Sequence, residues 1–162
     1  MRKGQSAMEY LMTYGWAILV IIIVIAVLFY IGVLNPRNVT PTVCNFPPGI
    51  SCSSFKLTSP DGQLFLIIGQ ATGHKIHVTN VACSQETTAS DTSWTPETVD
   101  IIQGETGNLS STAIQCYDVN GLAITGATAG ETAKFRIWIN YTEADTGMTR
   151  QVLGDMTGRY EP

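Results

Sequence analysis

The sequence predicts an α+β protein, in which one long apolar helix at the N-terminus precedes a domain built of β-strands. Two observations lead to this fold class. Residues 16–34 contain no charged residue and no proline. Residues 36–162 are rich in Thr, Ser, Gly and Asn, and their apolar residues recur with the period of two that is typical of strands. Four prolines within residues 35–49 separate the two parts and predict an extended neck.

The apolar run is long enough to cross a membrane. About twenty residues of helix span about 30 Å, which is the thickness of the hydrocarbon core of a bilayer. Aromatic residues of the kind that favour the membrane–water interface lie at both ends of the run: Tyr10, Tyr14, Trp16, Phe29 and Tyr30. The basic residues Arg2 and Lys3 precede it, which predicts a cytoplasmic N-terminus and an exported remainder.

A removable secretory signal is the first alternative to a retained helix. The apolar core of such a signal has about 7–15 residues and is followed by a site of small residues. The run in this chain is longer, and the YIGVLN of residues 30–35 offers no such site. We therefore expect one continuous helix of about thirty residues to remain in the mature protein.

The exported part is mildly acidic and contains every cysteine. It carries most of the thirteen Asp and Glu residues and has no basic cluster, which argues against nucleic-acid binding. An even number of cysteines in an oxidising compartment predicts two disulfides, for which three pairings exist. Cys44 and Cys52 flank a turn-rich segment, so a local bridge is easy, and Cys83 would then join Cys116. Three sequons also predict glycosylation at Asn38, Asn108 and Asn140.

Short alternating segments predict the strands of the head. We expect strands at residues 54–59, 63–70, 74–84, 110–119 and 132–142, and a bulged final strand within 146–160. Asn120-Gly121 predicts a hairpin, and residues 85–100 read as a long loop with a short strand near 99–102. Six to eight short strands with frequent turns favour an antiparallel β-sandwich of immunoglobulin-like type.

No residue pattern indicates catalysis, a cofactor or a metal. His74 and His77 are the only histidines, and three residues apart in a strand they face opposite sides with no evident third ligand. The aspartates sit at turns or strand ends, where carboxylates bind backbone N–H groups. Trp94 is either a packing residue beneath its own loop or an exposed binding aromatic. We therefore expect a protein that is not an enzyme.

Glu9 is the one acid that precedes the apolar run. In a simple membrane anchor it would lie in the cytoplasmic headgroup region, where a carboxylate costs little. A functional role needs a positive partner. Cleavage between Gly4 and Gln5 would remove Arg2 and Lys3 and create an α-ammonium at Gln5, one helical turn from Glu9. That amine could also pair with Glu9 of an adjacent chain.

These N-terminal residues resemble archaeal type IV pilins with class III signal peptides. The matching elements are the short basic start, Gly4 before Gln5, Ser6, Glu9, Leu11 and the uninterrupted apolar helix. The resemblance implies cleavage at Gly4–Gln5 by a membrane prepilin peptidase, and then assembly by the pilus machinery into a homopolymer that serves in adhesion. It implies a prepeptide (1–4), a membrane-spanning and then filament-core helix (5–35), a neck (36–53) and a β-sandwich head (54–162). The predicted filament core is formed by Trp16, Ile18, Leu19, Ile22, Ile25, Leu28 and Phe29.

Two alternatives to the pilin remain. One is a bitopic anchor for an extracellular β-domain that is never cut and never polymerises. The other is a minor pilin-like adhesin or a sugar-binding subunit that uses the same signal.

Overall fold

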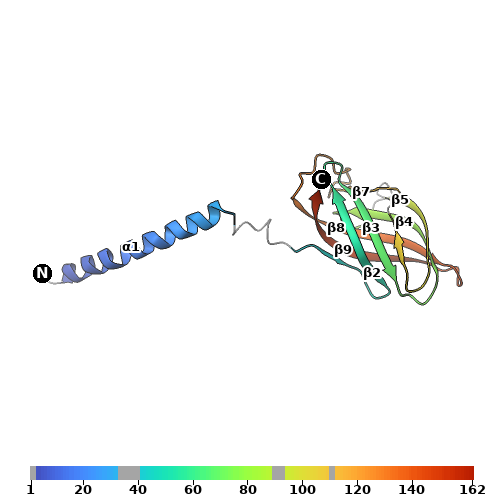
Figure 1. The fold of residues 1–162 in the computed structure, drawn as a ribbon, viewed down its shortest axis with the longest axis horizontal. Coiled ribbons are helices and arrows are strands. Elements are labelled where there is room, and N and C mark those ends of the chain that lie inside the picture. Colours follow the sequence, from blue (N-terminus) through green and yellow to red (C-terminus); the bar gives the residue numbers. More distant parts are fainter. Residues whose placement is uncertain (1–2, 33–40, 89–93, 110–111) are drawn as a thin grey trace. The chain divides into compact units, whose positions relative to one another are not determined.

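The computed structural model describes residues 3–32, 41–88, 94–109 and 112–162. The chain forms two compact units, Met1–Thr40 and Pro41–Pro162, and each is described here by itself. The first unit contains the helix α1 and the second contains all the strands (Figure 1). The predicted order of an apolar helix followed by a β-rich domain is therefore confirmed.

Helix α1 runs without interruption from Lys3 to Tyr30, over 28 residues. The absence of proline and the density of apolar residues explain its continuity. The prediction extended the helix to residue 35, and residues 33–35 lie outside the described part of the chain. The backbone N–H of Ile31 still donates to the carbonyl of Val27 at 2.9 Å. Gly32 then takes a φ of +73°, a left-handed conformation that glycine adopts without steric cost and that commonly ends helices.

Nine strands form the described part of the head. They are β1 (Val43–Asn45), β2 (Ile50–Thr58), β3 (Gln63–Gln70), β4 (Ile76–Ser84), β5 (Trp94–Ile101), β6 (Thr106–Asn108), β7 (Ile114–Tyr117), β8 (Thr132–Glu143) and β9 (Thr149–Glu161).

Six of these strands close into a ring in the order β9-β2-β3-β7-β4-β8 and back to β9. Strands β1, β5 and β6 pair with β9, β4 and β3 at residues that the short ladders of the ring leave open. Two of the ladders that close the ring are parallel: β2 with β9, and β4 with β7. The head is thus a mixed six-strand barrel with additional strands, and not clearly the antiparallel immunoglobulin-like sandwich that we expected.

The closure depends on contacts between residues that are far apart in the sequence. Strand β9 has thirteen residues, so it continues beyond its pairing with β8 and places Tyr160 beside Leu57 of β2. The other parallel ladder places Cys83 beside Cys116. Both ladders involve only two residue pairs, which is too short to leave a recognisable pattern in the sequence.

The core of the head lies inside this ring. Phe135, Ile137, Ile139 and Tyr141 of β8 point inward and are buried, as their alternation predicts. Trp138 points to the opposite face with Arg136 and Asn140, yet only 5% of it is exposed. Ala82 and Leu153 flank Trp138 on the neighbouring strands, and Trp94 lies beyond Ala82. The register places these four side chains in one apolar row on the outer face, in which Trp94 is half-buried.

The segment predicted to be part of the neck packs into the head. A Cβ atom added at Gly154 of β9 would collide with the ring of Phe46, and one added at Gly158 would collide with Phe55 and Leu57. Glycine at these two positions lets β1 and β2 approach β9 closely. The compact unit that contains the strands therefore begins at Pro41, within the predicted neck.

Two local predictions need correction. Residues 94–101, which were expected to lie mostly in a loop, form β5. Pro96 fits there because β5 is an edge strand and Pro96 lies opposite the β4 bulge near Asn80. The turn predicted at Asn120-Gly121 is present, with a φ of +72° at Gly121, but the returning chain makes only one isolated bridge, Tyr117 with Ala123.

Candidate functional site

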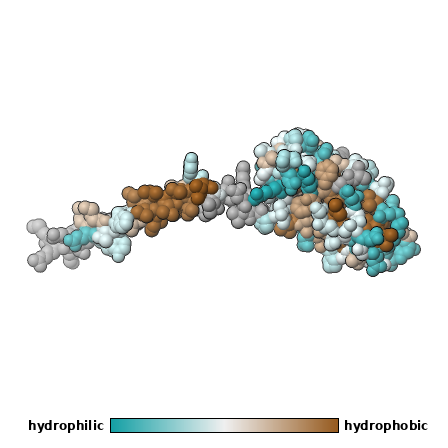
Figure 2. Space-filling model, viewed as in Figure 1, coloured by the Kyte–Doolittle hydropathy of each residue, from teal (hydrophilic) through white to brown (hydrophobic). Residues whose placement is uncertain are grey.

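The second half of α1 is apolar around its circumference. The helix from Met8 to Tyr30 is long and apolar enough to cross a membrane, and none of its described side chains is buried within the chain. Figure 2 shows the hydrophobic colour covering most of the second half of this helix. Of the seven predicted filament-core residues, Leu28 is half-buried and the other six are exposed: Trp16, Ile18, Leu19, Ile22, Ile25 and Phe29.

The start of α1 is more polar. Glu9 is exposed, and its backbone carbonyl accepts a hydrogen bond from the hydroxyl of Thr13 at 2.8 Å. The rings of Tyr10 and Tyr14, one turn apart, have their centroids 4.3 Å from each other. The Gly4–Gln5 bond lies in the first turn, where backbone N–H groups have no intrahelical partner, so local unwinding there costs little. The side chain of Gln5 lies outside the described part of the chain.

The structure contains two disulfides, Cys44–Cys52 and Cys83–Cys116. This is the predicted pairing that includes the local bridge between Cys44 and Cys52. Cys44–Cys52 joins β1 to β2 across eight residues, and Cys83–Cys116 joins β4 to β7 at the parallel ladder. An N-terminal apolar helix together with two disulfides indicates a secreted or membrane-anchored protein.

The predicted glycosylation sites lie in different settings. Asn108 is exposed on β6, a three-residue strand at the edge of β3. Asn140 is half-buried in the middle of β8, and its amide oxygen accepts a hydrogen bond from Gln151 at 3.0 Å. Asn38 lies outside the described residues.

Charged side chains gather where β8 turns into β9. Nδ1 of His74 lies 2.5 Å from a carboxylate oxygen of Asp145. Beside this pair, Glu143 is 4% exposed, and it accepts hydrogen bonds from Thr146 at 2.7 Å and from Nε of Arg150 at 2.5 Å. His74 precedes β4, so it does not share a strand with His77, and it meets two carboxylates that are about seventy residues away in the chain.

Hydrogen bonds keep these carboxyl groups ionised. The bond from His74 holds the pKa of Asp145 below its ordinary value. The hydroxyl of Thr146, and then Arg150, lower the pKa of Glu143, although its burial acts in the opposite direction. A second histidine pair lies nearby: Nδ1 of His77 is 2.6 Å from Asp100, whose pKa is lowered by Lys75 and then by His77.

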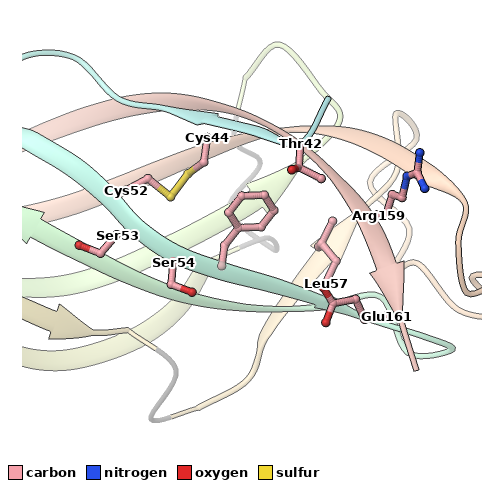
Figure 3. Close-up of a pocket in the computed structure, with 9 residues that line it drawn as sticks. Thr42, Cys44, Cys52, Ser53, Ser54, Leu57, Arg159 and Glu161 are labelled. Atoms are coloured by element: carbon pink, nitrogen blue, oxygen red, sulfur yellow. A yellow bond between two sulfur atoms is a disulfide. The ribbon is translucent and has the colours of Figure 1, made fainter. Parts of the chain in front are cut away.

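A shallow groove of about 380 Å³ lies where the chain enters the head (Figure 3). The Cys44–Cys52 disulfide lies toward one end of it, and Arg159 and Glu161 lie toward the other. The remaining described lining residues are Thr42, Ser53, Ser54, Phe55 and Leu57. These lining residues include no histidine or free thiol, so within this lining no nucleophile is paired with a base.

Comparison with known proteins found no matching family model, no matching curated protein and no matching solved structure. The arrangement of an apolar N-terminal helix before a β-rich domain is consistent with a pilin-like architecture.

Proposed function

We propose that this chain is the structural subunit of an adhesive surface filament of the archaeal type IV pilus kind, and that it polymerises through α1 after cleavage at Gly4–Gln5. One observation carries the proposal. An unbroken 28-residue helix exposes apolar side chains around its circumference, while the domain that follows has a closed core of its own.

A helix of this kind needs an apolar environment on every side. Full burial of one Leu, Ile, Val or Phe side chain contributes about 1.5–3 kcal/mol, so exposure of many such residues in water is very unfavourable. A single neighbour could cover only one stripe of a helix that is hydrophobic all round. Lipid before assembly, and a bundle of several identical helices afterwards, both satisfy this requirement.

The cost of the Glu9 carboxylate differs between a lipid bilayer and a bundle of helices. A carboxylate at the centre of a bilayer costs about 2.5–3.5 kcal/mol on insertion scales, and less toward the end of the helix. In a bundle of cleaved chains, the new ammonium group of Gln5 would neutralise Glu9 of the same or a neighbouring chain. This pairing would help to set the register between subunits.

The test is replacement of Glu9 by Ala in the cells that make the protein. We expect filaments to be lost, whereas cleavage at Gly4–Gln5 and folding of the head are retained, as measured by electron microscopy and by the mass of the mature chain. Thr13→Ala is the matched control, because Thr13 lies one turn further and its hydroxyl is bonded within the helix. Normal filament yield in Glu9→Ala would overturn the charge-pairing role.

A bitopic anchor is the second candidate, and the length of the apolar helix favours it equally. The two candidates differ in the mass of the native protein. The pilin requires a chain that begins at Gln5, and Gly4→Val should then block processing, whereas Gly15→Ala should leave it intact. A native chain that keeps Arg2 and Lys3 and is found only in the membrane would support the anchor.

A further inference from the structure

We propose that the β8–β9 hairpin end of the head binds one divalent transition-metal ion of the zinc type through His74, Glu143 and Asp145. This binding site does not depend on whether the chain polymerises. One possible ligand atom from each of the three residues lies within 4.8 Å of the others, so a small movement of these side chains would let a single ion contact all three.

The three residues come from segments that the backbone holds together. Glu143 is the last residue of β8, Asp145 lies in the following turn and His74 lies just before β4. The N–H of Ala144 donates to the carbonyl of Lys75 at 2.8 Å, which ties the turn to the segment that contains His74. The side chain of Gln70, which is almost fully buried, donates to the carbonyl of His74.

The carboxylates are also oriented by partners of their own. The hydroxyl of Thr146 donates to Oε2 of Glu143 at 2.7 Å, and the N–H of Thr146 donates to Oδ1 of Asp145 at 3.0 Å. The other oxygen of Asp145 faces Nδ1 of His74. Such supporting hydrogen bonds are typical of residues that ligate metals, because they fix the direction of each lone pair.

The types of ligand select the class of ion. Calcium and magnesium prefer sites made only of oxygen atoms, whereas imidazole nitrogen combined with carboxylate suits zinc and its neighbours in the first transition row. The ion would take the place of the direct contact between Nδ1 of His74 and the carboxylate of Asp145. Three protein ligands would leave a coordination position for water or for a donor group from outside the chain.

The positive charge of Arg150 would repel a metal ion bound at this site. Nε of Arg150 lies 2.5 Å from Oε1 of Glu143. A carboxylate has about four lone-pair sites, so Glu143 can accept the hydrogen bond from Arg150 and bind a metal ion at the same time. The side chain of Arg150 is 54% exposed, which gives it room to move away.

His77 provides an internal control. It pairs with Asp100 just as His74 pairs with Asp145, but the third group beside Asp100 is the ammonium of Lys75, at 2.6 Å. A cation cannot ligate a metal. Loss of a histidine should therefore matter at position 74 and not at position 77.

The test uses the full-length chain in detergent, stripped with EDTA and titrated with zinc chloride by calorimetry, with retained zinc measured by elemental analysis. We expect one zinc ion per chain, an affinity at least tenfold lower in His74→Ala and Asp145→Ala, and an unchanged affinity in His77→Ala. A tenfold excess of calcium should not compete. Arg150→Gln should bind zinc several-fold more tightly, because it removes the opposing charge.

A second variant separates binding from folding. His74→Gln keeps a side chain that can donate to Asp145 but that ligates zinc poorly, and circular dichroism reports whether the head is folded. A folded His74→Gln chain with weakened zinc binding supports the site. Absence of zinc from the wild-type chain, an equal loss in His77→Ala, or an unchanged affinity in folded His74→Gln would overturn it.

Discussion

The helix and the head use the same apolar residue types in opposite ways. Ile22 of α1 is 60% exposed, whereas Ile137 of β8 is completely buried. The ring of strands gives Ile137 neighbours on every side, and no described part of the chain gives Ile22 a comparable environment. The head therefore buries its apolar side chains in its own core, whereas α1 can bury them only against lipid or other molecules.

Matched truncations at these two isoleucines test the comparison most strongly. Ile137→Ala should lower the free energy of unfolding of the head by about 2–5 kcal/mol, because it leaves a cavity in the core. Ile22→Ala should leave that free energy unchanged. Chemical denaturation of the full chain, followed by near-ultraviolet circular dichroism, measures both. A head that is destabilised equally by Ile22→Ala would mean that α1 contributes to the folding of the head.

The two disulfides sharpen the comparison within the head, since α1 contains no cysteine. On the chain-entropy model, replacing Cys83 and Cys116 by serine should cost about 3.7 kcal/mol. Replacing Cys44 and Cys52 should cost about 2.5 kcal/mol, because that loop is shorter. The bridges span 33 and 8 residues respectively. Guanidinium midpoints of the two double variants give the order, and a reversed order would refute the loop-length explanation.

Glycine substitutions offer a smaller test of the same contrast. Gly154→Ala in β9 should destabilise the head by about 1–3 kcal/mol, because the new methyl group meets the ring of Phe46. A Cβ atom at Gly15 of α1 meets nothing within 4 Å, so Gly15→Ala should not change the stability of the head. Thermal unfolding monitored by circular dichroism compares the two variants. An unaffected Gly154→Ala head would show that Phe46 can move aside without cost.

The smallest expected effect is a pH dependence of the free energy of unfolding of the head. Backbone N–H groups of Leu122 and Asn120 donate to Asp118, and these bonds hold the pKa of Asp118 below its ordinary value. The stability that this lowering contributes is present above the unfolded-state pKa, about 3.9, and is lost as the pH falls through the folded-state value. Asp118→Asn should therefore show a shallower loss of stability below about pH 4. Identical acid limbs in the two proteins would contradict this assignment.

Several features of the fold could be predicted because they rest on local pattern. The continuity of α1 follows from an apolar run without proline, and the inward face of β8 follows from strict alternation around Phe135 and Ile139. The disulfide pairing was accessible because the turn between Cys44 and Cys52 makes a local bridge easy.

The remaining features depend on contacts between distant residues. The parallel ladders rest on two residue pairs each, and β5 contains a proline that only its edge position permits. The surroundings of His74 could not be predicted, since Asp145 lies 71 residues further along the chain. An aspartate in a hairpin turn has an adequate local role, so nothing in the sequence links it to a histidine before another strand.

The Cys44–Cys52 bridge also has a mechanical consequence. In the proposed adhesive filament, tension would reach each head at Pro41, three residues before Cys44. Strand β1 has only one short ladder, with β9, and could peel away under such a force. The bridge would stop that extension at Cys44 and pass the pull to β2, whose ladder with β3 involves eight residue pairs. The covalent link would thus carry the load past β1 directly to β2, so that unfolding of the barrel would not begin at β1.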